Sequence, residues 1–457
     1  MARTPIHVQP PLEFIPPALT PWVVGAVGKI LPFYLKSFTS ITEVDTENVE
    51  RLVELYRDFQ AGNTRFLMAF RHPNTMDPLI LGYFLARAVP DVARKMGIAL
   101  ATRPHTYFLY DRGIPLWACS VAAWLLPRMG GISLQRGKLD RQSLRTTRSL
   151  FANGDQPMMV APEGATNGLN EVVSPLEPGI AQMGFWCMED LQEKGRNEKV
   201  VIVPIGIRYR YLEPPWEQLD TILGQMETDC GLTREAGTDR YARLIRIGER
   251  LVGLLEQYYS RFYQQTLPET ADFPTRLKNL MEAALRVSET FFDLPPKGGL
   301  ADRCRRIEQA GWDRIYREDL KGQQLSPVER GMADRIAEES DLRMWHMRLV
   351  ESFVAVTGTY AYEKPTAERF AEMVSIAYQT LQRLQGKTQF DSLAPGKQRV
   401  KITVGLPLSV DARWDAYQSG RSAARQEVAE LTRELQQALE TMIRETDTAH
   451  SVPSDSS

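Results

Sequence analysis

Short apolar runs alternate with helix-like segments over the first half of this chain, and this alternation constrains its fold more than any other feature. Strands that are separated by helices favour a mostly parallel sheet with helices on both faces. We therefore expect an α/β fold in which polar functional groups gather beyond the strand ends. The predicted strands are Arg65–Arg71, Gly97–Thr102, Pro157–Ala161 and Val200–Tyr211, and the predicted helices are Pro78–Ala88 and Pro178–Lys194.

Residues 213–395 have mainly helical patterns, and strand character returns only at Val400–Val404. We therefore predict that a large helical insertion interrupts one α/β domain. In that case Val400–Val404 joins the sheet that contains Val201–Ile205, and Leu212 lies close to Pro395. The longest helices expected here are Ala242–Phe262, Pro274–Phe292, Pro327–Val356 and Thr366–Leu384, and a helix with one apolar stripe follows from Asp411 to about Arg444.

Composition and charge are those of an ordinary globular protein. The chain has 457 residues, of which 43% are hydrophobic and 25% charged, and its net charge of −2 gives no attraction to nucleic acid. Residues 101–150 differ, because eight Arg or Lys and two Asp give them a net charge of +6. This charge suits phosphates, acidic headgroups or an acidic carrier protein, and equally a solvated face. Four scattered cysteines predict reduced thiols and a cytoplasmic protein.

Two uncharged segments, Phe14–Gly28 and Gly113–Pro127, are 15 residues long. A membrane span needs roughly 20 apolar residues, so neither is expected to cross a bilayer, and the first residues show no secretory signal. Both segments contain tryptophan, which suits the headgroup region of a membrane. Packing against the protein's own core would also explain them. We expect peripheral association with a membrane surface, through Phe14–Gly28 in the first place.

His72 and Asp77 stand five positions apart, where a strand is expected to end and a helix to begin. A histidine can act as a general base near neutral pH, and a carboxylate can orient its ring and stabilise the imidazolium. The pair could therefore activate a hydroxyl group. A helix start with Asp77 as N-cap and Pro78 at the first position, beside a packed histidine, would give the same pattern.

Three further segments of the chain bear on the interpretation of His72 and Asp77. Together with His72 and Asp77 they resemble, in order and approximate spacing, the four blocks of the glycerolipid acyltransferase family over roughly residues 60–210. The closing strand end of that family resembles Gly405-Leu-Pro-Leu408. The resemblance implies an α/β acyltransferase fold. The three segments are Gly131-Ile-Ser-Leu-Gln-Arg136, Ala161-Pro-Glu-Gly-Ala-Thr-Asn167 and Val201-Ile-Val-Pro-Ile205.

The resemblance also implies roles for the matched residues. His72 would be the general base and Asp77 its orienting partner, without a covalent acyl-enzyme. Arg136 would bind the phosphate of the acceptor. No metal and no cofactor are implied, because the acyl donor, acyl-CoA or acyl carrier protein, is itself a substrate. The other residues expected at the acceptor site are Asn74, Glu163, Gly164 and Thr166.

One position departs from the family pattern. The third block commonly reads Pro-Glu-Gly-Thr-Arg-Ser, but Thr166 stands here at the arginine position. Arginine is the usual choice for bidentate phosphate recognition. The expected activity is transfer of a fatty acyl group to a hydroxyl of a glycerol-phosphate lipid precursor, first of all 1-acylglycerol 3-phosphate. Glycerol 3-phosphate or another lysophospholipid is the alternative acceptor.

Two other functional classes stay open at this point. A metal-dependent phosphohydrolase could use His72 and Asp77 as ligands, although His105 is the only other histidine close to them in the sequence. A non-catalytic lipid-binding protein is the third class, and it would not need the His/Asp pair. His346 is expected to be packed in the helical region.

The expected organisation has four parts, and the expected partners are membrane-surface lipids and the acyl donor. The parts are an N-terminal membrane-associating segment (1–45), an acyltransferase domain (46–212 plus 396–445), a helical insertion of unknown role (213–395) and a disordered tail (446–457).

Overall fold

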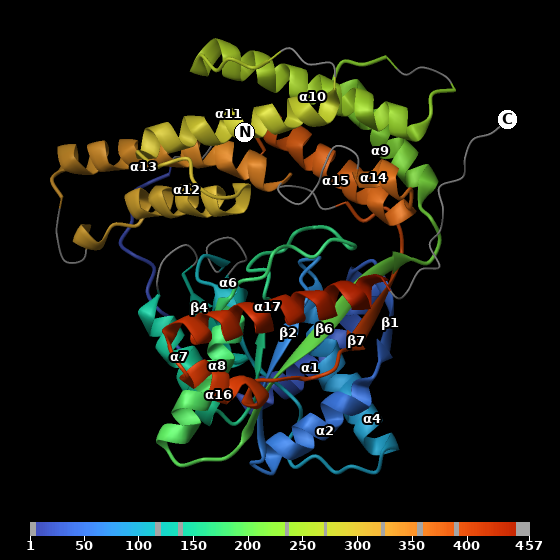
Figure 1. Cartoon of the computed structure of the whole chain (residues 1–457). Helices are drawn as coiled ribbons and strands as arrows, with labels where there is room; N and C mark the ends of the chain where they lie inside the picture. The colour runs from blue at the N-terminus through green and yellow to red at the C-terminus, as the bar shows by residue number, and fades with distance from the viewer. Residues whose placement is uncertain are drawn as a thin grey trace.

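An eight-stranded mixed sheet forms the centre of the lower unit of the computed structural model, and helices form an upper unit above it (Figure 1). The lower, α/β unit contains most of the first half of the chain together with the C-terminal strands and helices. The structure describes residues 6–114, 120–135, 140–233, 237–268, 272–320, 325–353, 360–387 and 393–444.

The strand order is β1-β7-β6-β2-β5-β3-β4, and β8 pairs with β6 outside this path. Neighbouring strands are parallel except where β7 and β8 run antiparallel to β6. The prediction of a mostly parallel sheet between helices is therefore confirmed. The strands are β1 (Ile41–Glu47), β2 (Thr64–Phe70), β3 (Tyr107–Asp111), β4 (Gly131–Leu134), β5 (Met158–Val160), β6 (Lys199–Tyr211), β7 (Gln398–Val404) and β8 (Leu408–Ser409).

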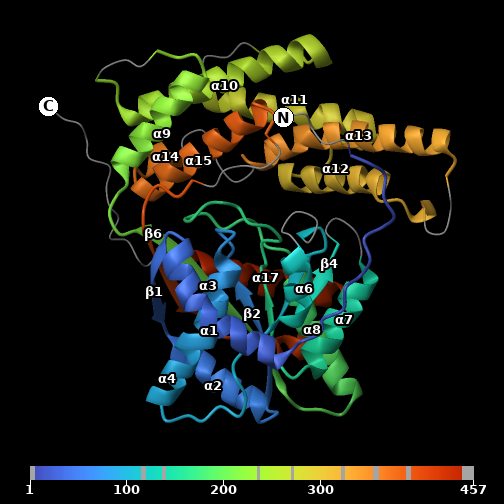
Figure 2. The same ribbon diagram turned by 180° about the vertical axis from the view of Figure 1, so that it is seen from behind.

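Alternation along β2 explains why helices cover both faces of the sheet. Phe66 and Met68 contribute to one hydrophobic core, whereas Leu67 and Ala69 contribute to the other. Figure 2 shows the helices of the first face and Figure 1 those of the second. The first set is α1 (Pro21–Phe38), α2 (Val49–Gln60), α3 (Asp77–Tyr83), the π-helical turn Phe84–Ala88 and α4 (Val89–Lys95); the second is α7 (Arg141–Asn153), α8 (Gly179–Glu193), α16 (Trp414–Gln418) and α17 (Arg421–Arg444), and α6 (Ser120–Arg128) lies beside β4.

The chain leaves the sheet to form the helical unit and returns to the sheet next to the point where it left. Tyr211 of β6 is paired with Gln398 of β7, and the N–H of Leu212 donates to the carbonyl of Lys397 at 3.0 Å. The prediction that Val400–Val404 joins the sheet beside the strand of residues 201–205 is confirmed. The helices between are α9 (Trp216–Asp229), α10 (Arg240–Tyr263), α11 (Phe273–Phe292), α12 (Leu300–Ile315), the 3₁₀ turn Glu318–Leu320, α13 (Pro327–Glu351), α14 (Tyr360–Glu363) and α15 (Ala367–Leu384).

The N-terminal residues connect the two units. Val8 is fully buried in the helical unit, and the N–H of Gln9 donates to the carbonyl of Ile315 at 2.8 Å. The chain then descends to α1, which packs on the α/β unit. Because Val8 and Gln9 pack in the helical unit, fewer of residues 1–45 are available to contact a membrane than the sequence suggested. None of the described helices is both long and apolar enough to cross a bilayer.

Two predicted elements differ from the structure. Gly97–Thr102 is not a strand, and the third strand is Tyr107–Asp111 instead. The apolar side chains Ile98 and Leu100 pack against the core from an irregular segment, which Gln60 fixes by accepting the N–H of Ala101 at 2.7 Å.

The helix expected from Asp411 to Arg444 is also interrupted. It begins with a 3₁₀ turn, and α16 ends at Gln418 before α17 begins at Arg421. Tyr417 of α16 stacks on Phe185 of α8, with ring centroids 4.2 Å apart. This contact holds the short helix against α8, while the apolar stripe of α17 covers the sheet separately.

Candidate active site

Two neighbouring parallel strands bring the site together. β2 ends at Phe70 and β5 at Val160, and Ala69 is paired with Val160. The loops that follow these strands therefore meet at one edge of the sheet. His72 comes from the first loop and Glu163 from the second, and the backbone N–H of His72 donates to Oε1 of Glu163 at 3.0 Å.

The carboxylate of Asp77 is completely buried and receives three hydrogen bonds. Its Oδ2 accepts from Nδ1 of His72 at 2.8 Å and from the backbone N–H of Asn74 at 2.9 Å, and its Oδ1 accepts from the hydroxyl of Tyr209. Burial raises the pKa of Asp77 above its ordinary value, and the hydrogen bond and charge of His72 together with the hydroxyl of Tyr209 oppose that rise. The three donors thus replace the water that the carboxylate has lost.

The contact with Asp77 fixes the ring of His72. An ionised carboxylate can only accept, so His72 donates through Nδ1–H and its Nε2 carries the lone pair. The ring of Phe70 packs edge-on against the imidazole, with centroids 5.5 Å apart. The side chain of His72 remains 18% exposed. A histidine held in this way can accept a proton from a substrate hydroxyl.

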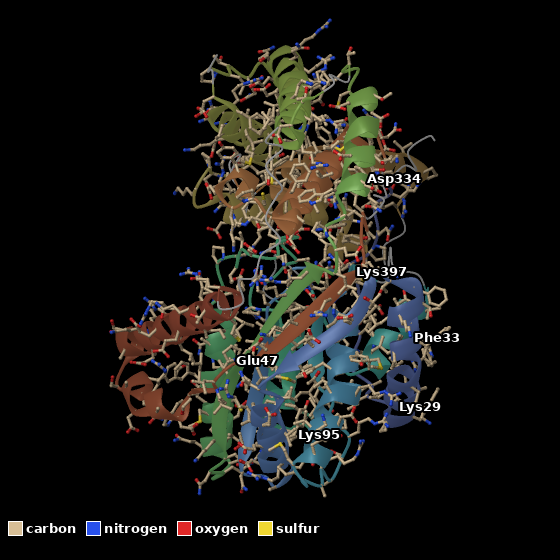
Figure 3. All side chains as sticks on the ribbon, turned by 90° about the vertical axis from the view of Figure 1, so that its right-hand side faces the viewer. Lys29, Phe33, Glu47, Lys95, Asp334 and Lys397 are labelled. Carbon is tan, nitrogen blue, oxygen red and sulfur yellow. The ribbon has the colours of Figure 1, made fainter. Side chains whose placement is uncertain are left out.

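A large cleft of about 2660 Å³ lies between the two units, and it is lined by residues next to His72 and Asp77 in the sequence rather than by the pair itself. The loop that carries His72 contributes Pro73 to Met76 to its wall, and the loop after Glu163 contributes Ala165 to Gly168. Lys397, labelled where the two units meet in Figure 3, also lines it. The helical unit contributes Trp312, Trp345, Arg348, Ser375 and Arg383 among others.

Glu163 organises the second loop. Its Oε1 binds the backbone of His72, and its Oε2 accepts from the side-chain amide of Asn167 at 2.9 Å and from the N–H of Ser174 at 2.8 Å. Gly164 follows with a φ of 72°, a left-handed conformation that a glycine adopts readily. The turn at Gly164 therefore lets the buried carboxylate of Glu163 face back toward His72.

The guanidinium of Arg71 holds the remainder of this loop. Arg71 is fully buried, and its terminal nitrogens donate to the backbone carbonyls of Leu169, Asn170 and Val172. Burial lowers the pKa of Arg71, and the neighbouring carboxylates, first of all that of Glu163, oppose this effect. The terminal nitrogens of this buried guanidinium hold three carbonyls in position, since losing one of these bonds would leave a buried donor poorly compensated.

A chain of hydrogen bonds joins the helical unit to Asp77. Glu372 of α15 accepts the N–H of Asn170 at 2.9 Å and the hydroxyl of Tyr360 at 2.9 Å. The side chain of Asn170 binds both backbone groups of Tyr209, at 2.8 Å to its N–H and 2.5 Å to its carbonyl. Tyr209 then donates to Asp77. Burial raises the pKa of Glu372 to about 8, so this carboxyl group is mostly protonated at neutral pH.

The residues expected at the site fall into three groups. His72, Asp77 and Glu163 are joined by the hydrogen bonds described above. Asn74 and Thr166 line the cleft, and Gly164 is exposed beside it. Arg136 lies outside the described residues. The expected contact of His72 with Asp77 is present, whereas the catalytic and acceptor-binding roles of all these residues stay predictions.

Sequence reasoning missed Arg71, Asn167, Asn170 and Tyr209. Arg71 is directly adjacent to His72, so its position beyond a strand end could have suggested a role. Tyr209 follows Ile205 and Ile207 at every second position of β6, and this spacing places all three on one face of the sheet. Nothing in the sequence links Asn170 to Tyr209, because the contact depends on the folded loop.

Among the other described histidines, His7 lines the cleft, where its Nδ1 contacts Oδ2 of Asp334 at 3.0 Å, whereas His105 and His346 do not line it. Nε2 of His105 contacts the carbonyl of Met129 at 2.8 Å. His346 is fully buried, as expected, and burial lowers its pKa to about 3. Among the described residues, no group of three or more His, Cys, Asp or Glu could hold a metal ion. The described cysteines, Cys187, Cys230 and Cys304, are free and buried.

The family model described as Acyltransferase matches residues 40–208, a range that includes all four sequence blocks from His72 to Pro204. No curated protein matches the chain.

The first testable prediction concerns Tyr209. Replacing Tyr209 by Phe removes a donor from a buried carboxylate, a hydrogen bond worth about 1.5–3 kcal/mol, so kcat is expected to fall about 10- to 100-fold. The pKa of Asp77 rises further without this donor, so the acid side of the pH–rate profile moves to higher pH. Steady-state kinetics across pH test both effects.

Tyr56→Phe is the matched control, because Tyr56 is also buried and its hydroxyl donates to the carbonyl of His105 at 2.8 Å, while Tyr56 is not among the described residues that line the cleft. It should leave the profile in place. An unshifted profile in Tyr209→Phe would show that this hydroxyl does not support Asp77.

Proposed function

We propose that this chain, whose residues 40–208 match the acyltransferase family model, transfers a fatty acyl group from a thioester to a hydroxyl of a glycerol-phosphate lipid precursor. The observation that carries this proposal is the hydrogen bond of Nδ1 of His72 to the buried Asp77, in a loop whose residues Pro73 to Met76 line the large cleft. A partly buried histidine that is held by a carboxylate through one ring nitrogen is suited to general-base catalysis through the other.

The proposed reaction proceeds without a covalent enzyme intermediate. Nε2 of His72 accepts the proton of the acceptor hydroxyl while the oxygen attacks the thioester carbonyl. The C–O bond forms, the C–S bond breaks, and the proton passes from His72 to the thiolate that leaves. Asp77 stabilises the imidazolium between these steps. The buried Cys187 is unsuited to act as a nucleophile, since burial raises the pKa of its thiol.

The proposed acceptor is 1-acylglycerol 3-phosphate, with glycerol 3-phosphate or another lysophospholipid as the alternative. Arg136 is the residue proposed to bind its phosphate. Asn74 and Thr166 line the cleft where the acceptor would lie. The donor is acyl-CoA or acyl carrier protein, and a cleft of about 2660 Å³ has room for parts of both substrates.

We also propose that the protein docks on a membrane surface through α1. Its outer side exposes Trp22, Ile30, Phe33 and Phe38, each by more than half of its surface. Figure 3 labels Phe33 together with the basic Lys29 on this helix. Apolar and aromatic side chains beside lysines are typical of a helix that lies in the headgroup region.

The same surface extends to neighbouring elements. Trp124 of α6 packs against Trp22 with ring centroids 6.4 Å apart, and Arg128 lies over the ring of Trp124 at 4.5 Å. Tyr34 and Phe38, at the end of α1, line the cleft. A lipid that leaves the membrane at this helix would therefore enter the cleft directly.

The second testable prediction concerns acyl transfer itself. Purified protein is offered labelled acyl-CoA or acyl carrier protein with glycerol 3-phosphate, 1-acylglycerol 3-phosphate or neutral lysolipids. The His72→Ala variant should lose about 10²–10⁴-fold in kcat, because general-base catalysis contributes rate enhancement of that size. Arg136→Ala should instead raise the KM of a phosphate-bearing acceptor and leave neutral acceptors unchanged.

The outcomes separate the functional classes. Full activity in His72→Ala would contradict the proposed mechanism. Lipid binding without any acyl transfer in the unmodified protein would favour a non-catalytic lipid-binding protein. An unchanged acceptor KM in Arg136→Ala would place the phosphate site elsewhere.

The third testable prediction concerns the membrane. Phe33→Asp should weaken binding to vesicles that contain anionic phospholipids by about tenfold or more, because burying a phenylalanine side chain contributes about 1.5–3 kcal/mol. Sedimentation with the vesicles measures the bound fraction. Phe262→Asp is the matched control, since Phe33 and Phe262 are both 66% exposed but Phe262 lies on α10 of the helical unit. Equal binding of the two variants would exclude α1 as the contact.

A further inference from the structure

A second, smaller cavity of about 280 Å³ lies inside the helical unit, between α10, α11, α13, α14 and α15. None of the described residues that line it is charged, and nearly all are aliphatic or aromatic. Deeply buried examples are Leu280 and Val350, while Ile245 and Tyr362 at its edge are exposed to solvent. The cavity is therefore an apolar pocket whose edge reaches the solvent.

Helix α15 is the wall between this cavity and the cleft. Its spacing of three and four residues places one set of side chains on each side. Ile376 lines both spaces, so a single side chain separates them at that point. On α15, Met373, Ala377 and Thr380 also line the cavity. Glu372, Ser375 and Gln379 of the same helix line the cleft.

The cavity also adjoins the loop that orients His72. Met373 and Ile376 pack in one cluster with Leu169 and Val172 of the α/β unit. The carbonyls of Leu169 and Val172 are the ones that bind Arg71, the residue before His72. An occupant of the cavity would therefore lie next to the loop on which the site is built.

We propose that this cavity binds the fatty acyl chain of a lipid substrate whose polar end lies in the cleft, with the side chain of Ile376, which lines both spaces, moving aside to let the chain pass. This inference rests on the proposed acyl transfer and adds the place of the chain. An apolar lining without charge would exclude a phosphate or a nucleotide. A single flexible chain fits a cavity of this volume, whereas an α-helix about 10–12 Å wide does not.

The proposal implies a dependence on chain length. Each methylene that enters an apolar site contributes about 0.8 kcal/mol, which corresponds to an affinity change of about fourfold at most. Affinity should rise by this factor per methylene until the cavity is full and then level off. Loose binding of lipid to an open surface would not level off at a particular chain length.

The experiment measures binding of a fluorescent long-chain fatty acid to the full chain. Ala377→Trp places a large ring in the cavity, and the probe is expected to bind at least tenfold more weakly. Ala242→Trp is the matched control, since Ala242 is exposed on α10 and does not line the cavity. Unlabelled fatty acids of increasing length then displace the probe from the unmodified protein.

The outcomes are distinguishable from those of the acyl-transfer assay. Tight binding that falls in Ala377→Trp and persists in Ala242→Trp would support the cavity. Equal affinity in both variants would overturn this inference, while acyl transfer by the unmodified protein would still support the proposed function. Saturable probe binding without acyl transfer would contradict the proposed function. The cavity would then be a lipid-binding site without a role in acyl transfer.

A second measurement avoids dependence on the folding of Ala377→Trp. A photoreactive fatty acid is cross-linked to the unmodified protein, and the adducts are located by mass spectrometry of peptides. Adducts on α10, α11 or α15 are expected. Adducts confined to the exposed face of α1 would overturn the inference, because they would place the chain in the membrane-contact surface instead.

Discussion

The burial of the Asp77 carboxylate is the constraint on which the site depends. A carboxylate removed from water must be compensated by donors, and here they come from His72, the backbone of Asn74 and Tyr209. The register of β6 beside β2, in which Ile205 is opposite Phe70, sets how far Tyr209 extends beyond the strand end. The sheet therefore positions one of the three donors that hold the Asp77 carboxylate beside Nδ1 of His72.

The helical unit completes the site as well as covering it. Glu372 supports Asn170, and Asn170 supports Tyr209. Glu171 adds a second connection, because its carboxylate contacts Arg208 of β6 at 2.9 Å and Arg369 of α15 at 3.0 Å. The cleft exists only between the two units, so the insertion supplies one wall of the space in which substrates would bind.

Local patterns predicted much of the fold and the central pair of the site. The strands β2, β5 and β6 and the spacing of His72 and Asp77 follow from apolar runs and strand ends. The prediction of a strand at Gly97–Thr102 was wrong, because apolar side chains can also pack on the core from an irregular segment. Here Gln60 holds that segment through a hydrogen bond. Tyr209 and the apolar cavity could not be predicted, since both depend on packing between segments far apart in the sequence.

The most direct test of this account is the position of the proton on the ring of His72. Nitrogen NMR of ¹⁵N-labelled histidine distinguishes the two ring nitrogens, and loss of one signal set in His72→Ala assigns it among the five histidines of the chain. In the neutral ring we expect the proton on Nδ1 and the lone pair on Nε2. The preference for this tautomer should be lost in Asp77→Ala. A proton on Nε2 in the unmodified protein would contradict it, because no lone pair would then face the substrate.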